Sequence, residues 1–177
     1  MLTVRDATVP DLPEITAIYN ALLETTTHEW TEALHAVSER AEWLAEQNAA
    51  GRPALVAIDD HDGNDRGEVV GWATFGDFRD SVRWPGYRHT VEHSIHVRED
   101  RWGRGVGRAL MWELVARARR DGKHVMVAGI DGSNTRSIRF HERLGFFEVA
   151  RMPEIGEKFG RRLDLVLMQL MLDDTVL

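Results

Sequence analysis

The spacing of apolar residues along the chain switches between the period of a strand and the period of a helix. Residues 2–6 alternate apolar and polar side chains, which predicts a first strand. Apolar residues then recur every three or four positions up to about Leu23, which predicts a helix that begins at a cap formed by Thr8 or Asp11. A second helix is predicted over residues 39–48, with Ser38 as its N-cap.

The middle of the chain predicts three strands. Residues 54–58 and 68–75 are two apolar runs separated by the turn-rich stretch 59–67, a pattern typical of a hairpin. Residues 89–97 are rich in β-branched side chains and predict the third strand. Residues 76–88 are too long and irregular for a tight turn, so we interpret them as a surface loop.

The last part of the chain alternates helices with strands. An amphipathic helix is predicted from about Gly107 to Asp121, and a buried strand over residues 123–130. A further helix follows a cap at Ser133 or Asn134, and strands are predicted over residues 146–150 and 162–172.

The order of the predicted elements indicates the α/β (α+β) class. One strand and two helices are followed by three strands, and the rest of the chain alternates before it ends in two strands. This order fits a mixed central sheet of about seven strands flanked by helices on both faces. With 177 residues and no internal linker or repeat, we expect a single domain over residues 1–177.

Composition excludes several classes of function. The formal net charge of −7 argues against nucleic acid as a partner. No stretch approaches the ~18 apolar residues of a membrane span, so we expect no membrane partner and a cytoplasmic location. The absence of cysteine excludes disulfides, thiolate metal sites and a cysteine nucleophile.

Three alternating glycines stand where the strand period gives way to the helix period. Gly103, Gly105 and Gly107 end the connection after residues 89–97, and four arginines bracket them. Unpaired backbone N–H groups at a helix start attract phosphate, so this loop predicts a site for a phosphate-bearing ligand. A dinucleotide fold would place such glycines after the first strand, and here they follow the fourth. For any single arginine, an ordinary solvated surface position is the alternative.

A metal-like motif precedes the loop. His89, Glu92 and His93 match the H-x-x-E-H pattern of one zinc peptidase class. That pattern brings two histidines together on a helix, whereas on a strand they lie about 13 Å apart at roughly 3.3 Å per residue. Because the segment reads as a strand, we expect no metal site.

Glu92 is the candidate general base of this strand. Alternation places it on one face together with Ser94 and His96, just before the glycine loop. Burial there would raise the pKa of its carboxyl group toward the range that proton transfer needs. The alternative is a structural carboxylate paired with Arg79 or Arg88.

Besides the strand, glycine loop and helix, six further segments are informative: residues 18–20, 76–79, 90–94, 125–128, 134–146 and 156–161. Together with that unit, and in this order, they resemble the Gcn5-related N-acetyltransferase (GNAT) superfamily, and more narrowly the phosphinothricin and methionine sulfone/sulfoximine acetyltransferases. The similarity covers essentially the whole chain.

The resemblance implies that acetyl-CoA binds at the end of the predicted fourth strand. The N–H of Val97 would donate to the thioester carbonyl, and the glycine loop would hold the pyrophosphate. The implied cofactor-binding residues are Ile95, His96, Val97, Gly103, Arg104, Gly105, Val106, Gly107, Arg108 and Asn134.

The resemblance also implies direct attack of an amine on the thioester in a ternary complex, with Glu92 as the base. His141 stands where many relatives carry a tyrosine that protonates the leaving thiolate, so it is either the general acid or a structural residue. The implied substrate-binding residues are Tyr19, Trp30, Arg79, Trp84, Glu92, His93 and Ser94.

The function expected from the resemblance is N-acetylation of a small amino acid or an analogue such as phosphinothricin or methionine sulfoximine. The alternatives are acetylation of another small amine or of a protein N-terminus, and a non-catalytic CoA-binding sensor. Relatives commonly pair, so we expect a homodimer.

The sequence departs from the family pattern at two places. Trp102 opens the glycine loop where Gln or Arg is usual, and Arg101 or Arg104 would supply the missing charge. Residues 80–85 lengthen the substrate loop.

Overall fold

The computed structural model describes residues 1–60 and 67–172, which fold as two compact units. The first unit comprises Met1–Ala21, Leu34–Phe75 and Ser94–Arg117, and the second comprises Leu22–Ala33, Gly76–His93 and Ala118–Leu177. Several elements run from one unit into the other, so the units share secondary structure.

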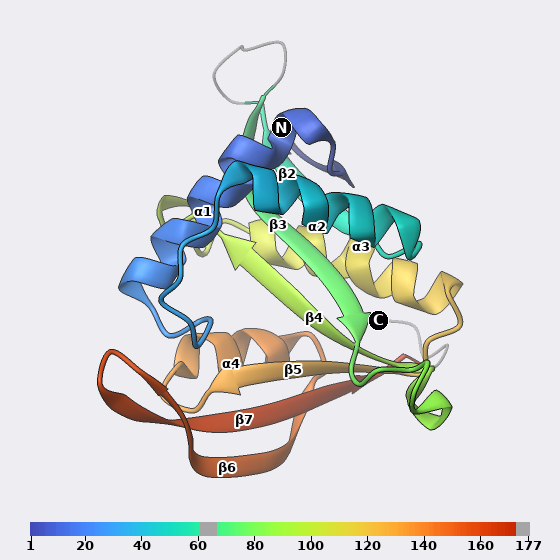
Figure 1. Ribbon diagram of the computed structural model, residues 1–177, viewed down its shortest axis with the longest axis vertical. Coiled ribbons are helices and arrows are strands. Elements are labelled where there is room, and N and C mark those ends of the chain that lie inside the picture. Colours follow the sequence, from blue (N-terminus) through green and yellow to red (C-terminus); the bar gives the residue numbers. More distant parts are fainter. Residues whose placement is uncertain (61–66, 173–177) are drawn as a thin grey trace. The chain divides into compact units, whose positions relative to one another are not determined.

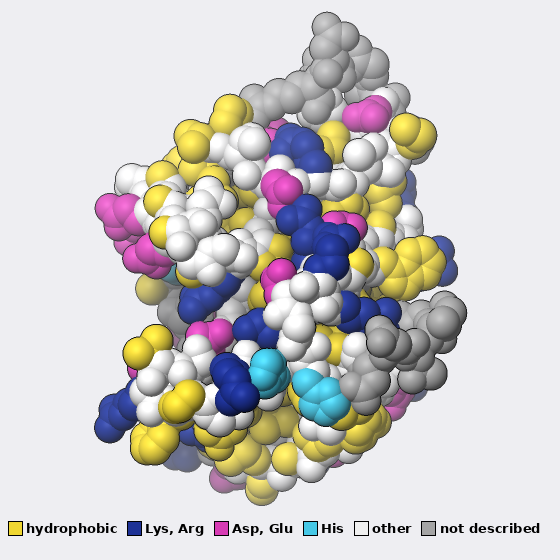
Figure 2. Space-filling view, turned by 90° about the vertical axis from the view of Figure 1, so that its right-hand side faces the viewer, with side chains coloured by type: hydrophobic (Ala, Val, Ile, Leu, Met, Phe, Trp, Pro, Cys, Tyr) yellow, Lys and Arg dark blue, Asp and Glu magenta, His cyan; other side chains and the backbone are white. Residues whose placement is uncertain are grey.

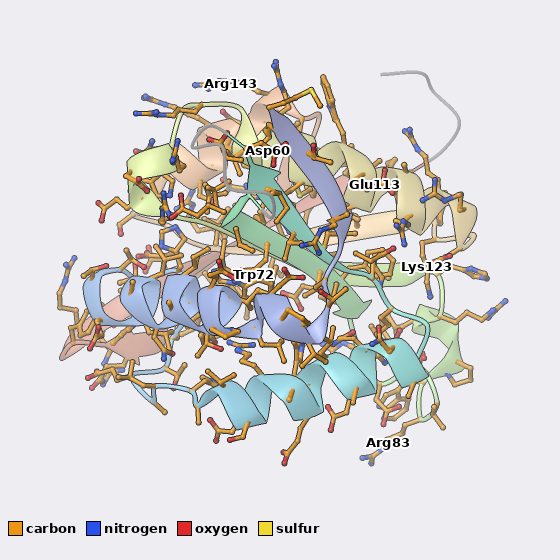
Figure 3. All side chains as sticks on the ribbon, turned by 90° about the horizontal axis from the view of Figure 1, so that it is seen from above. Asp60, Trp72, Arg83, Glu113, Lys123 and Arg143 are labelled. Atoms are coloured by element: carbon orange, nitrogen blue, oxygen red, sulfur yellow. The ribbon has the colours of Figure 1, made fainter. Side chains whose placement is uncertain are left out.

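The first unit is a layered arrangement of helices on antiparallel strands. Its elements are β1 (Leu2–Asp6), most of α1 (Leu12–Thr25), α2 (Val37–Ala49), β2 (Ala54–Asp59), most of β3 (Glu68–Asp77) and most of α3 (Val106–Arg120). Strand β2 pairs antiparallel with β1 and with β3. Helices α1 and α2 cover one face of these strands, and α3 covers the other (Figures 1 and 3).

The second unit contains a parallel strand pair and a long hairpin. Strand β4 (Thr90–Val97) pairs in parallel with β5 (Val125–Asp131), with Glu92 opposite Val127. After α4 (Thr135–Arg143), strands β6 (Phe147–Lys158) and β7 (Arg161–Met171) form the hairpin seen at the bottom of Figure 1, and β7 pairs antiparallel with β5.

The seven strands follow the hydrogen-bonded order β1-β2-β3-β4-β5-β7-β6. The sheet is mixed because β4 and β5 run parallel, and a parallel pair needs a crossover, which α3 supplies. The predicted class, a mixed sheet of about seven strands with helices on both faces, is confirmed.

Each unit has its own apolar core. In the first unit the helical stripe of α3 and the central residues of β2 and β3 are buried, among them Leu110, Leu114 and Val70. In the second unit Met126 of β5 and Met168 of β7 are fully buried. These positions are the ones that the helical and strand periods predict to face inward.

Three predicted details need correction or fall outside the structure. Helix α2 begins at Val37 rather than after Ser38, because the N–H of Ala36 donates to the Glu39 carboxylate at 2.7 Å, which caps the helix two residues earlier. Strand β6 continues to Lys158, well past the predicted end at residue 150. Most of the predicted turn 59–67 lies outside the described residues.

No helix among the described residues is long and apolar enough to span a membrane.

Candidate functional site

The glycine loop of the first unit presents open main chain at the start of α3. Gly103 and Gly105 adopt φ values of 76° and 86°, and no atom lies within 4 Å of the position that a Cβ would take at either residue. The first N–H groups of α3, from Val106 to Arg108, have no acceptor within the helix, and the helix dipole places partial positive charge there. The loop therefore offers donors to an anionic ligand.

The arginines around this loop differ in their partners. Arg98 pairs with Glu68 and Asp100, and Arg101 pairs with Asp59 at 3.0 Å. Those acids offset the two positive charges, so the geometry favours Arg104 over Arg101 as the positive charge that would attract an anionic ligand. On the face drawn in Figure 2, Lys and Arg side chains are likewise interspersed with Asp and Glu.

Trp102 ties the start of the loop to the end of β4. Its indole Nε1–H donates to the carbonyl oxygen of Val97 at 2.7 Å. A hydrogen bond of this kind restricts the main chain at Val97, the residue whose N–H is predicted to donate to the thioester. The unusual residue at the loop start thus has a structural role of its own.

The side chain of His96 is buried in an aromatic cluster of the first unit. It stacks on Trp72 with the ring centroids 4.5 Å apart and meets the edge of Tyr19 at 5.2 Å. The Arg40 guanidinium lies 3.9 Å from the Tyr19 ring centroid. Trp72, labelled in Figure 3, contributes to this cluster from β3. His96 and Tyr19 therefore meet each other, and His96 offers a ligand its main chain rather than its ring.

Glu92 lies on β4 in the second unit with one carboxylate oxygen directly over β5. A Cβ at Gly129 would stand 3.1 Å from Glu92 Oε1, so a larger residue there would require the Glu92 side chain to shift by a few tenths of an ångström. Glu92 is exposed on β4 rather than buried as predicted, yet partial desolvation still raises the pKa of its carboxyl group above the ordinary value, and the charge of Glu29 raises it further. Among the residues that the structure describes, Glu92 forms no ion pair with Arg79 or Arg88. This carboxylate can accept a proton more readily than an ion-paired one.

His93 and His141 form a buried pair in the second unit. Their Nε2 atoms lie 3.2 Å apart, and His141 Nδ1 lies 2.8 Å from the carbonyl oxygen of Ser137. A carbonyl can only accept, so Nδ1 of His141 carries the proton and, in the neutral ring, Nε2 accepts the proton of His93 Nε2. Burial lowers the pKa of His141 to about 4, so the ring is neutral at pH 7.

Asn134 caps α4, as predicted. Its Oδ1 accepts the N–H of Ser137 at 3.0 Å. Three residues before it, Asp131 at the end of β5 accepts the N–H of Ser133 and the hydroxyl of Thr27. These bonds fix the turn between β5 and α4 on which the predicted cofactor contact of Asn134 depends.

The predicted substrate loop is held by its own aromatic residues. The Arg79 guanidinium lies 5.7 Å from the Phe78 ring centroid and 5.6 Å from that of Tyr87. Trp84 is 54% exposed, with Arg83 over its ring. Within the part of the chain that the structure describes, Arg79 and Trp84 thus contact side chains of their own loop, while Ser94 and Ile95 are half-buried on β4.

Sequence reasoning missed Glu29 and Lys158. Glu29 lies in the segment Leu22–Ala33 of the second unit, together with Trp30, and its charge acts on Glu92. Lys158 is only 2% exposed and donates to two carbonyl oxygens of that segment. The signal for Lys158 is a lone lysine within segment 156–161, one of the segments that resemble the family; a single lysine suggests no role by itself.

The chain is similar to known acetyltransferases over nearly its full length. Residues 15–146 match the profile described as the acetyltransferase (GNAT) family. An L-methionine sulfoximine/L-methionine sulfone acetyltransferase from Pseudomonas paraeruginosa is 47% identical over 98% of this chain and 96% of its own. A phosphinothricin N-acetyltransferase from Alcaligenes faecalis is 36% identical over 94% of this chain and 81% of its own.

A solved structure supports the same relationship. The structure of yncA from Salmonella typhimurium with its cofactor acetyl-CoA superimposes with a TM-score of 0.89 at 43% sequence identity, covering 99% of this chain and 96% of that one.

Proposed function

The chain belongs to the acetyltransferase (GNAT) family, and on this premise we propose that it transfers the acetyl group of acetyl-CoA to the α-amino group of a small amino acid or analogue. The resemblance read from the sequence is confirmed. The substrates that we propose are of the methionine sulfone, methionine sulfoximine and phosphinothricin type. The observation that carries the proposal is the match over nearly the whole chain to an enzyme named for two of these substrates.

The glycine loop supports acetyl-CoA as the co-substrate. Its positive-φ glycines leave the main chain accessible, and the N–H groups of residues 106–108 with the side chain of Arg104 would hold the pyrophosphate. The main chain of Ile95, His96 and Val97 would hold the pantetheine arm, and Asn134 would contact the cofactor. Bound acetyl-CoA supplies the acetyl group as a reactive thioester.

Glu92 is the proposed general base. Desolvation and the charge of Glu29 raise the pKa of its carboxyl group, which makes it a better proton acceptor than an ordinary glutamate. It accepts the proton of the amine, directly or through a water molecule. The N–H of Val97, restrained through Trp102, would donate to the oxygen on which negative charge develops.

His141 remains the prediction for the general acid. With its Nδ1 proton donated to Ser137 and its Nε2 accepting from His93, the neutral His141 ring has no proton to give to a thiolate, so acid catalysis would require the protonated ring. The alternative is a structural role for the pair. If His141 is the acid, His141→Asn lowers kcat although the protein remains folded under the assay conditions. If His141 is structural, the loss of activity follows the loss of folded protein alone.

The remaining substrate contacts are proposals drawn from the family. Trp30 and Tyr19 would form walls for the amine, and His93 and Ser94 would line β4. Arg79 would bind the substrate carboxylate, and Trp84, exposed on the lengthened loop, would cover the substrate side chain.

One assay tests the proposal and separates it from the alternatives. Release of free CoA from acetyl-CoA is measured with methionine sulfone, methionine sulfoximine, phosphinothricin, natural amino acids, polyamines and peptides. We expect turnover with the amino acid analogues. Turnover only with polyamines or peptides would instead favour another small amine or a protein N-terminus, and tight CoA binding without any turnover would favour a sensor.

We also propose that the protein forms a homodimer. Strand β6 stands at the edge of the strand order and exposes Phe147, Val149, Met152 and Ile155. Exposed apolar residues on an edge strand favour pairing with another chain. Sedimentation equilibrium is expected to give twice the chain mass, and Val149→Glu is expected to shift the distribution toward the monomer.

The lack of cysteine supports a cytoplasmic location as a further proposal, because the chain makes no use of an oxidising compartment. Cell fractionation with detection of the untagged protein would test it.

A further inference from the structure

Within the second unit, the end of β6 holds the segment Leu22–Ala33 at several points. The Trp30 ring lies directly on Gly156, and a Cβ at that position would overlap ring atoms Cε3 and Cζ3. The glycine is therefore required for the close approach of Trp30 rather than for a left-handed backbone.

Lys158 provides the second point of attachment. Its Nζ donates to the carbonyl oxygens of Leu23 at 2.7 Å and Thr26 at 2.8 Å, where α1 ends. The last carbonyls of a helix have no intrahelical donor and carry partial negative charge, so an ammonium group suits this place. Burial of a charged group is unfavourable unless it is well bonded, and here the bonds go to the main chain of this segment.

Two further hydrogen bonds complete the attachment. The N–H of Phe159 donates to Glu32 Oε1 at 3.1 Å, and the hydroxyl of Thr27 donates to Asp131. The residues held in this way flank Glu29 and Trp30 on both sides. Glu29 is the group whose charge acts on Glu92, the proposed base.

We infer that Gly156, Lys158 and Phe159 form an anchor that positions Trp30 and Glu29 for the amine substrate, so that this part of the β6–β7 hairpin selects which amines are accepted. The three are positioning residues, since they act through the segment that they hold. The inference rests on the proposed function for its link to amines, whereas the anchor itself is a structural claim that can be tested without turnover.

The close contact between Gly156 and Trp30 allows a double-mutant test. In Gly156→Ala the new methyl group displaces the Trp30 ring, and we expect the KM for the amine to rise about tenfold, with the KM for acetyl-CoA unchanged within twofold. In the Trp30→Leu background the same change is expected to have less than a twofold effect, because the obstructing ring is gone. Gly122→Ala is the control, since Gly122 has a φ of 66° and no atom near its Cβ position; it is expected to cost stability without affecting the KM for the amine.

Lys158→Met tests the anchor without a steric change. It keeps the length of the side chain and removes the donor, so the amides of residues 22–33 are expected to exchange with deuterium at least tenfold faster in the intact protein, while those of β5 keep their protection. Lys158→Arg, which retains donors, is expected to restore part of the protection.

Several results would overturn the inference. Unchanged exchange in residues 22–33 of Lys158→Met removes the anchor. If Gly156→Ala raises the KM for the amine equally with Trp30 and with Leu at position 30, the contact with the Trp30 ring is not the cause. If the KM values for the amine and for acetyl-CoA rise equally, the anchor does not select amines. If the unmodified protein acetylates no amine, the proposed function fails, and the exchange result still decides whether the anchor exists.

Discussion

Two pairs of glycines, one pair in each unit, serve opposite purposes. In the loop before α3, Gly103 and Gly105 have positive φ and open space around them. In the second unit, Gly129 and Gly156 have ordinary φ, and the space that a side chain would fill is taken by Glu92 and Trp30. The first pair leaves main chain accessible to a ligand, while the second pair admits other side chains of the protein. The same residue type thus marks a candidate binding loop at one place in the chain and a close side-chain contact at another.

The charged and polar side chains discussed above also have different partners in the two units. The arginines near the glycine loop pair with Asp59, Glu68 and Asp100 in partly exposed positions, where such pairs contribute little to stability. In the second unit Lys158 and His141 are buried and bond mainly to main-chain carbonyls. Polar groups buried in this way have large effects when they are changed. The largest responses to mutation are therefore expected in the second unit.

Glu92→Gln is expected to give the largest effect. It removes the proposed base and keeps the shape, so kcat should fall by roughly 10²–10⁴-fold, the usual contribution of a positioned base. The KM for acetyl-CoA should stay within twofold. Steady-state kinetics measure both, with Glu42→Gln on exposed α2 as the control. A kcat within threefold of the unmodified protein would remove Glu92 from the mechanism.

The His93–His141 pair predicts a stability loss on acidification. The pKa of His141 is about 4 in the folded protein and 6.5 ordinarily. Between these values the unfolded chain binds more protons, so the stability contribution is present above pH 6.5 and is lost as the pH falls toward 4. The free energy of unfolding should therefore drop by about 2 kcal/mol more between pH 7 and 5 than in His141→Asn. Urea unfolding measures this difference, and equal drops would contradict it.

Gly105→Ala tests the open loop of the first unit. The backbone strain at a φ of 86° should cost about 1–2 kcal/mol and distort the proposed pyrophosphate site. The KM for acetyl-CoA should rise roughly five- to tenfold. Gly51→Ala is the matched control, because Gly51 also has positive φ and open space but lies after α2. A similar rise of KM in both variants would mean that general strain, and not the loop, is responsible.

Trp102→Phe is expected to give the smallest effect. It removes the indole donor to the Val97 carbonyl and keeps most of the ring. A hydrogen bond of this kind contributes about 1 kcal/mol, which is about fivefold, so the KM for acetyl-CoA should rise by at most about fivefold. Trp112→Phe, at an exposed position of α3, should change nothing. An unchanged KM in Trp102→Phe would leave the residue with no role in the loop.

The periodic parts of the fold could be predicted from the sequence, and the irregular boundaries could not. The spacing of apolar residues is determined locally, so it located α3, β5 and the strand that carries Glu92. The continuation of β6 was missed because Pro153 and Gly156 read as breakers, although the strand passes them with a shift of register between Met152 and Gly156. The start of α2 was misplaced because the Glu39 side chain, rather than Ser38, caps the helix.

The candidate residues come from the family resemblance and their roles stay predictions, whereas their contacts could not be predicted from the sequence. His93 and His141 are 48 positions apart, and Lys158 is 132 positions from Thr26. No local pattern reports such a contact. The role of Gly156 could not be predicted either, because the chain looks the same whether a glycine bends the backbone or makes room for a distant tryptophan.

The dependence of kcat/KM on pH with methionine sulfone tests the central claim most directly. If Glu92 is the base, kcat/KM rises with pH through a midpoint above the ordinary glutamate pKa of 4.5, because desolvation and Glu29 favour the protonated form. In Glu92→Gln, kcat/KM should be much lower, and it should no longer rise with pH through this midpoint. An acidic limb that persists unchanged in Glu92→Gln would contradict the account.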